Sequence, residues 1–321
     1  RARQDFTFFR RAYFPHYCLV GGDSRLHEWL DAELPRMADA PEGVRLAIAA
    51  PPGEAKSTFV TLFFVLWAVL TGRKHYILII ADALEQAASL LGAVKDELEF
   101  NEALKRDFPG AGKGHVWNVG TVVTPGNVKI QALGAGKRMR GLRHGPHRPD
   151  LIVLDDLEND GNVDKPEQRD KLQSWLQKTV LNLGAADGSM DVVYVGTLLH
   201  YDSVLARTLR KPLWKARTFR SILRWPDRMD LWDEWESLLS SRGEAEARRF
   251  YCQHRAKMEA GAEVSWPASR PLYRLMCLRV EDREAFDSEQ QNDPLSGDDA
   301  PDAPPLALMV TVLPSILAAR A

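Results

Sequence analysis

The sequence predicts an α/β fold with a mainly parallel sheet and a smaller, mostly helical C-terminal subdomain. Four short apolar runs without polar interruption alternate with longer segments of helical pattern. Such runs are typical of parallel strands covered on both faces, and their alternation with helices implies right-handed crossovers. From about residue 226 the pattern becomes helical and rich in Trp and Arg, which indicates the second subdomain.

The predicted elements follow one another along the 321 residues of the chain. They are a helical segment at 5–40, a strand at 44–49, a helix at 56–71, a strand at 76–81, a helix to about 100, a hairpin at 114–133, a Gly- and Arg-rich loop at 134–149, a strand at 151–154, a helix at 165–182 and a strand at 190–195. The expected domains are an N-terminal helical segment (1–40), a sheet-containing core (41–225), a helical subdomain (226–294) and a Pro-rich linker with an atypical tail (295–321).

The composition excludes some classes of protein. A formal net charge of −2 gives no global nucleic-acid signal, so any DNA-binding surface must be local. The three cysteines are far apart and lack metal-ligand spacing, so we expect a reduced, cytosolic protein. The apolar run 59–70 is too short to span a bilayer and predicts a buried helix, and we expect no membrane association.

A candidate phosphate-binding loop follows the first predicted strand. Residues 50–58 read Ala-Pro-Pro-Gly-Glu-Ala-Lys-Ser-Thr and lead into the apolar helix. A strand, a tight turn ending in Lys-Ser and a helix direct backbone amides and a positive charge at one anion. The residues expected to hold a nucleotide are Pro52, Gly53, Glu54, Ala55, Lys56, Ser57 and Thr58, and the Ser57 hydroxyl is expected to ligate Mg²⁺.

This loop departs from the usual pattern at two positions. Ala50 and Ala55 stand where such loops have glycine, and Pro51 and Pro52 each remove a backbone donor. The alternative interpretation is a Pro-Gly turn before an amphipathic helix, with an incidental Lys-Ser pair.

Two carboxylates follow the apolar strand 151–154. Asp155 and Asp156 stand at its carboxyl end, where ligands bind in open α/β sheets. A Walker B carboxylate at this position holds Mg²⁺, and a neighbouring acid polarises the attacking water. The alternative is that both acids only cap the next turn. Together with the upstream loop, the pair predicts a P-loop NTPase core of the RecA/ASCE-like type that uses ATP and Mg²⁺, with Asp155 as the metal ligand.

At this point the sequence resembles a known family, the large subunit of the tailed-phage DNA-packaging terminase. The resemblance is carried by the Pro-Pro-Gly-Glu-Ala-Lys-Ser-Thr loop and by the segment 138–150, Arg-Met-Arg-Gly-Leu-Arg-His-Gly-Pro-His-Arg-Pro-Asp, which runs directly into the aspartate-bearing strand. Val195-Gly196-Thr197 matches the position of the family's coupling motif, and 285–294 looks like the segment that follows the ATPase region. The resemblance covers about 5–294.

The resemblance implies roles for individual residues. Asp156 would be the water-polarising base, with Glu158 as the reserve, and Thr197 would sense hydrolysis. An arginine finger acting on the neighbouring subunit is expected at Arg140, chosen over Arg138 and Arg143. The candidate contacts to DNA phosphates come from two basic clusters and are Lys137, Arg143, Arg210 and Lys211. The alternative for these clusters is a solvated basic face.

The family also implies partners and a location. They are double-stranded DNA, a portal protein, the terminase small subunit and a homo-oligomeric ring, in the cytoplasm of a bacterial host and transiently at the procapsid portal. The family's nuclease domain is expected to be missing from this chain, so endonuclease activity is not expected, and Asp298, Asp299 and Asp302 of the tail are not expected to bind metal.

Two other functions remain open on the sequence alone. One is a superfamily 2-like helicase or translocase ATPase, which shares the loop and the Asp-Asp pair. The other is an inactive, truncated prophage remnant that only binds ATP. Trp225, Trp232 and Trp235 are expected to form the core of the C-terminal subdomain rather than a base-stacking platform.

Overall fold

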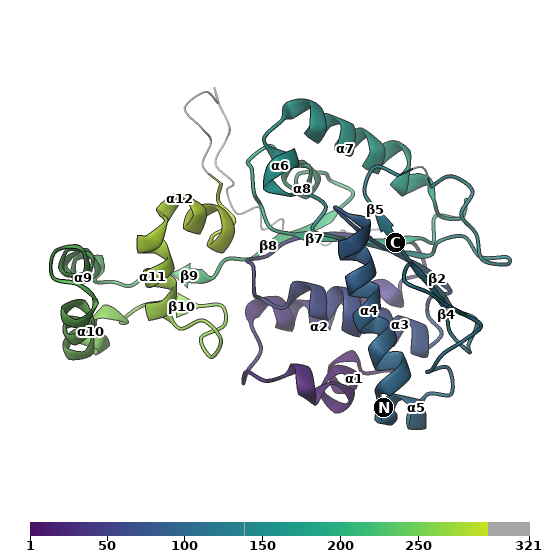
Figure 1. The fold of residues 1–321 in the computed structure, drawn as a ribbon, viewed down its shortest axis with the longest axis horizontal. Coiled ribbons are helices and arrows are strands. Elements are labelled where there is room, and N and C mark those ends of the chain that lie inside the picture. Colours follow the sequence, from purple (N-terminus) through teal and green to yellow (C-terminus); the bar gives the residue numbers. More distant parts are fainter. Residues whose placement is uncertain (138, 295–321) are drawn as a thin grey trace, which may run out of the picture.

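The computed structural model describes residues 1–137 and 139–294 (Figure 1). The predicted tail at 295–321, including its three aspartates, and the finger candidate Arg138 lie outside the described residues.

The core is an eight-stranded sheet in the order β3-β4-β5-β2-β6-β7-β1-β8. Its strands are β1 (Arg45–Ala49), β2 (Tyr76–Ala81), β3 (Val116–Trp117), β4 (Thr121–Val123), β5 (Lys129–Gly134), β6 (Leu151–Asp155), β7 (Asp191–Gly196) and β8 (Lys215–Thr218). The six strands from β5 to β8 along this order pair in parallel, and β3 and β4 are antiparallel additions at one edge. The prediction of a mainly parallel α/β sheet is confirmed.

The strand register brings three carboxyl ends together. Ala49 of β1 is opposite Gly196 of β7, and Val195 of β7 is opposite Asp155 of β6. The chain therefore leaves β1, β6 and β7 at one edge of the sheet, where ligands of α/β proteins bind.

Helices cover both faces of the sheet, with α2, α3 and α4 on one side and α6, α7 and α8 on the other (Figure 1). The helices of this part of the chain are α1 (Phe6–Tyr13), η1 (Pro15–Tyr17), α2 (Arg25–Ala38), η2 (Thr58–Phe64), α3 (Val65–Leu70), α4 (Leu84–Phe100), α5 (Glu102–Asp107), α6 (Asp160–Val163), α7 (Pro166–Lys178), η3 (Val180–Asn182) and α8 (Val204–Leu209). Alternate residues of each central strand belong to two separate apolar cores, Leu46 and Ile48 to one and Ala47 and Ala49 to the other. The uninterrupted apolar runs are thus explained by burial on both faces.

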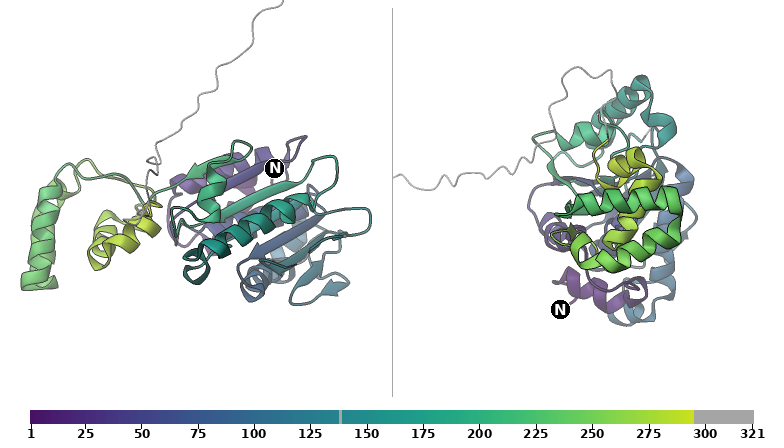
Figure 2. Two further views of the ribbon diagram at one scale, coloured as in Figure 1. Left: turned by 90° about the horizontal axis from the view of Figure 1, so that it is seen from above. Right: turned by 90° about the vertical axis from the view of Figure 1, so that its left-hand side faces the viewer.

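The C-terminal subdomain has its own core and extends away from the sheet beyond β8 (Figures 1 and 2). Its elements are β9 (Ile222–Arg224), α9 (Met229–Arg242), α10 (Glu244–Met258), β10 (Glu263–Val264), α11 (Leu272–Glu281), α12 (Arg283–Ala285) and η4 (Phe286–Gln290). Trp232 and Trp235 are buried there with their rings 5.5 Å apart, as predicted, whereas Trp225 is 37% exposed. In the described part of the chain, the structure contains no helix of the length and hydropathy that crossing a membrane requires.

Candidate functional site

The loop after β1 has the backbone of a phosphate-binding turn. The amide of Ala50 donates to the Gly196 carbonyl (2.9 Å), which fixes the start of the loop against β7. Gly53 and Ala55 both have positive φ, +77° and +56°. The left-handed conformation costs a residue with a Cβ about 1–2 kcal/mol, which is the physical reason for glycine at the second of these positions in the usual pattern. Ala55 adopts the required conformation in spite of its side chain.

The helix after the loop begins at the candidate site. Its first part is the π-helix η2, a form found frequently at functional sites, and it continues without a break into α3. The backbone amides at its start have no partner within the helix and carry the positive end of its dipole. An anion is therefore favoured at the loop, as the sequence predicts.

Lys56 joins the loop to two other strand ends. Its side chain is buried, and its ammonium donates to the Thr197 hydroxyl (3.2 Å) and forms an ion pair with Asp156 (3.4 Å). The Thr197 hydroxyl in turn donates to the Ala50 carbonyl (3.2 Å). Three residues that the sequence places in the site are thus in direct contact, although they leave three different strands.

Asp155 is held from two sides by hydroxyl groups. The Ser57 hydroxyl donates to one oxygen (2.9 Å), and the Thr61 hydroxyl donates to the other. Complete burial and the neighbouring Asp156 raise the pKa of Asp155 to about 6, while the two hydroxyls and Lys56 act in the opposite direction. A buried carboxylate beside a serine hydroxyl is an oxygen donor set that suits Mg²⁺, so Ser57 and Asp155 are the residues that would hold this ion.

Asp156 occupies a strained position beside Lys56. Its φ is +46°, a left-handed conformation that is uncommon for residues with a side chain and often marks functional sites. Its carboxylate packs on Gly196, where a Cβ would approach Asp156 Oδ1 to 3.3 Å and the Leu205 side chain to 3.2 Å. The side chain is 32% exposed, so this carboxylate is accessible to water while that of Asp155 is not.

Glu158, predicted as the reserve catalytic acid, makes its hydrogen bonds outside this arrangement. One carboxylate oxygen accepts from the Val204 amide (2.7 Å), and the other accepts from the Leu205 amide (3.0 Å) and the Tyr194 hydroxyl (3.1 Å). Burial raises the pKa of Glu158, and these hydrogen bonds oppose the rise. Glu158 therefore satisfies the free amides at the start of α8 instead of activating water.

The side chain of Glu54 is also directed away from the expected ligand. It is 1% exposed and accepts a hydrogen bond from the Ser265 hydroxyl (3.3 Å) of the C-terminal subdomain, and burial raises its pKa. The Glu54 carbonyl pairs with Nε2 of His27 (2.8 Å). Of the seven predicted loop residues, Glu54 thus contributes its backbone to the loop and its side chain to the subdomain contact.

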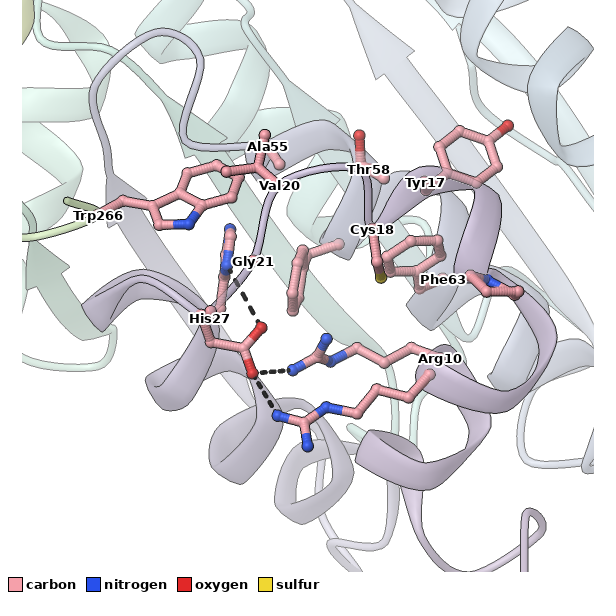
Figure 3. A pocket seen from close by; sticks show the side chains of 15 residues that line it. Arg10, Tyr17, Cys18, Val20, Gly21, His27, Ala55, Thr58, Phe63 and Trp266 are labelled. Carbon is pink, nitrogen blue, oxygen red and sulfur yellow. Dashed lines mark hydrogen bonds and ion pairs between the residues drawn. The ribbon is translucent and has the colours of Figure 1, made fainter. Parts of the chain in front are cut away.

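A cavity of about 490 Å³ adjoins the loop (Figure 3). Ala55 and Thr58 form its wall on the loop side, and Tyr17, Phe63 and Trp266 add aromatic surface. Flat aromatic walls next to a phosphate-binding loop suit the base of a nucleotide. The N-terminal segment and the C-terminal subdomain therefore both contribute to this cavity, which the sequence did not indicate.

The predicted arginine finger is exposed and separate from these residues. Arg140, like Lys137 and Arg143, lies on the loop between β5 and β6. Within residues 1–137 and 139–294, no ion pair joins Arg140 to Asp155 or Asp156. Its action on a neighbouring subunit stays a prediction.

The basic residues around Arg210 and Lys211 are partly neutralised by ion pairs. Arg207 is paired with Asp170 and Asp202, and Lys215 is paired with Glu33. Of the DNA-contact candidates there, Arg210 is exposed and Lys211 is half-buried. Burial, followed by the nearby Arg207 and Arg45, lowers the pKa of Lys211.

Two residues that support the site were missed on sequence. Thr61 is a lone polar residue in the apolar run 59–70, and this break in the pattern is a signal that could have identified it. His27 stacks on Phe59 (4.1 Å between ring centroids) and holds the loop through the Glu54 carbonyl. Nothing in the sequence around His27 distinguishes it from an ordinary helical residue.

A loop ending in Lys-Ser after β1, paired aspartates after β6 and a threonine after β7 meet at three adjacent carboxyl ends of a parallel sheet, where ligands bind in open α/β sheets. No protein-family model and no curated protein matches the chain. Among solved structures it is similar to the large terminase ATPase domain of Thermus phage P74-26, at 12% identity and a TM-score of 0.40, over 82% of this chain and 92% of that chain. An arginine-to-alanine mutant of that domain matches at 12% identity and a TM-score of 0.37, over 80% and 90%. Its structural neighbours are thus phage large terminase ATPase domains.

Proposed function

We propose that this chain is the ATP-hydrolysing motor subunit of a phage terminase, which moves double-stranded DNA into a procapsid. The observation that carries the ATPase part is the direct contact of Lys56 with Asp156 and Thr197, next to the buried Ser57–Asp155 pair. The terminase part is supported by the segment 138–159, whose arginine-rich lead-in to the aspartate pair resembles that family.

The proposed chemistry assigns one task to each residue. The loop amides and Lys56 bind the phosphates of ATP. Ser57 and Asp155 would hold Mg²⁺, which supplies neutralisation of phosphate charge when bound. Asp156, freed from Lys56 when phosphate oxygens take over the ammonium, orients the attacking water and accepts its proton. The Thr197 hydroxyl accepts a hydrogen bond from Lys56, so its position changes when the terminal phosphate is lost and Lys56 moves.

The remaining assignments extend beyond one chain. Arg140 would complete the site of a neighbouring subunit in a ring, where a guanidinium stabilises the charge of the transferring phosphoryl group. Lys137, Arg143, Arg210 and Lys211 would contact phosphates of the duplex without reading its sequence. The partners would be the portal protein and the small subunit, in the cytoplasm of an infected bacterium.

A steady-state ATPase assay tests the proposal. The chain is measured alone, with duplex DNA, and with duplex DNA and portal protein, and Lys56→Ala serves as the inactive control. Stimulation of ATP turnover by portal and duplex together is expected. Stimulation by single-stranded DNA alone would favour a helicase, and nucleotide binding without any turnover would identify a remnant; either result overturns the motor assignment.

A further inference from the structure

An arginine of the C-terminal subdomain lies directly on the phosphate-binding loop. Arg270 precedes α11, and a Cβ built on Gly53 would come within 2.1 Å of Arg270 Nη2. Gly53 is therefore required for two independent reasons, its positive φ and the close approach of this guanidinium. The loop and the subdomain are thus in contact at Gly53, and the group that makes the contact is the charged guanidinium of Arg270.

The guanidinium of Arg270 makes its hydrogen bond to a neutral group. Its Nη1 donates to the Gln290 side-chain oxygen, and the side chain forms no ion pair within the part of the chain that the structure describes. Burial lowers the pKa of Arg270 and Arg274 lowers it further, while the charges of Glu54 and Glu289 raise it. A guanidinium binds phosphate oxygens more strongly than a neutral amide, because both partners are then charged and the fork matches the oxygens.

The partner of Arg270 is connected to the end of β7. The backbone carbonyl of Gln290 accepts from the Ser221 amide (2.8 Å). Asn292, two residues further along, is buried. Its side-chain oxygen accepts a hydrogen bond from the amide of Leu198 (2.9 Å), which follows Thr197, and its side-chain nitrogen donates to the Phe219 carbonyl (2.8 Å). A short segment of chain therefore links the guanidinium on the loop to the strand end that carries Thr197.

We propose that Arg270 is a nucleotide-contacting residue that acts on the same chain, binds the terminal phosphate of ATP and exchanges its bond to Gln290 for one to phosphate oxygen. Gly53 lies three positions before Lys56, whose ammonium reaches the β- and γ-phosphates in such loops, so the Arg270 guanidinium lies on the loop that would bind these phosphates. The inference rests on the proposed ATPase function and adds a residue that distinguishes ATP from ADP, because ADP lacks the terminal phosphate. It is separate from Arg140, which is exposed on another loop.

Calorimetric titration with a non-hydrolysable ATP analogue and with ADP, both with Mg²⁺, tests this assignment. Arg270→Ala is expected to weaken binding of the analogue about 10- to 100-fold and that of ADP less than about threefold, because one charge-assisted contact to the terminal phosphate is lost. Arg270→Lys is expected to bind the ATP analogue with an affinity between that of the unmodified chain and that of Arg270→Ala. Arg249→Ala, an exposed arginine on α10 of the same subdomain, is the matched control and should change neither affinity.

The outcomes separate this inference from the function on which it rests. If the unmodified chain binds both nucleotides and Arg270→Ala keeps their affinity ratio, or loses both affinities equally, Arg270 only supports the loop and the inference is wrong. If the unmodified chain binds neither nucleotide, the ATPase proposal itself fails and the inference fails with it. Thermal unfolding of each variant shows whether a lost affinity reflects a lost fold.

Discussion

The ammonium of Lys56 donates to the hydroxyl of Thr197 across 3.2 Å, although 141 positions separate the two residues in the chain. The pairing of Ala49 with Gly196 puts the loop after β1 beside the end of β7 and so makes this contact possible. The same ammonium is paired with Asp156, so Lys56 connects the loop after β1 to the ends of both β6 and β7.

Replacing Thr197 by valine is expected to separate binding from turnover. Valine keeps the shape of the side chain but removes the hydroxyl that contacts Lys56 and the Ala50 carbonyl. We expect nucleotide affinity to stay within about threefold and ATP turnover to fall about tenfold or more, since the lost group acts on the reacting end of ATP. Titration and steady-state kinetics on one preparation measure both. Unchanged turnover in Thr197→Val would remove this residue from the mechanism.

Asp156→Asn and Glu158→Gln are expected to fail in different ways. Asp156→Asn should bind ATP and lose at least about 100-fold in turnover, because the amide cannot accept the water proton. Glu158→Gln should lose about 1–3 kcal/mol of unfolding free energy, since one acceptor for the amides at the start of α8 becomes a donor. Denaturant unfolding and turnover are measured for both. A stable Glu158→Gln protein without activity would reinstate Glu158 as the catalytic acid.

Mixed assemblies test Arg140. In a ring of wild-type and Arg140→Ala subunits, a variant subunit should bind ATP normally and leave its neighbour without a finger, so turnover should fall more steeply than the fraction of variant. A homogeneous Arg140→Ala ring is expected to lose about 10³-fold in turnover. The measurement is turnover against mixing ratio on assembled rings. Full activity of the homogeneous variant would exclude this role.

His27 is expected to make stability depend on pH. Burial lowers its pKa below the ordinary value of 6.5, the Glu54 carbonyl, Asp23 and Asp31 raise it, and Arg10 lowers it. The neutral ring fits, because Nδ1 accepts from the Ser24 amide (3.1 Å) and Nε2 donates to Glu54. The folded state therefore resists a proton that the unfolded chain takes up, and the stabilisation present above pH 6.5 is lost as the pH falls below that value.

The measurable quantity is the slope of the unfolding free energy against pH. One such group contributes up to about 1.4 kcal/mol of unfolding free energy per pH unit. His27→Gln should be less stable than the wild type at pH 7.5 and should lose part of the slope between pH 6.5 and 5, as determined by urea unfolding at several pH values. Parallel curves for the two proteins would contradict the assignment.

Gly53 and Arg270 are expected to couple in a double-mutant cycle. Gly53→Ala alone should lower the unfolding free energy by about 2 kcal/mol or more, from the left-handed backbone and the collision with the guanidinium. With Arg270→Ala in the same chain the collision disappears and only the backbone cost remains. The loss of unfolding free energy in the double variant should thus be about 1 kcal/mol smaller than the sum of the losses in the two single variants. Strict additivity would mean that the two residues do not touch in solution.

The elements that the sequence predicted best are those whose side-chain pattern is local. The strands at 76–81 and 151–154 are apolar at every position because both faces are buried. Lys56, Ser57, Asp155 and Asp156 could be singled out because phosphate and Mg²⁺ sites use those residue types after a strand, and the structure brings their side chains together. The contacts of Glu158 could not be foreseen, because a carboxylate near the aspartate pair looks the same in sequence whether it faces a ligand or caps α8.

The sequence by itself therefore determined the α/β class and the position of the Lys-Ser loop and of the paired aspartates after strands. The tertiary structure alone decided which distant groups meet there: Thr197 on Lys56, Thr61 on Asp155, and Arg270 on Gly53. The physical reason is that strand order and register, and the packing of a second subdomain, arise from burial summed over the whole chain, so the residues of one segment do not show which distant group they will meet.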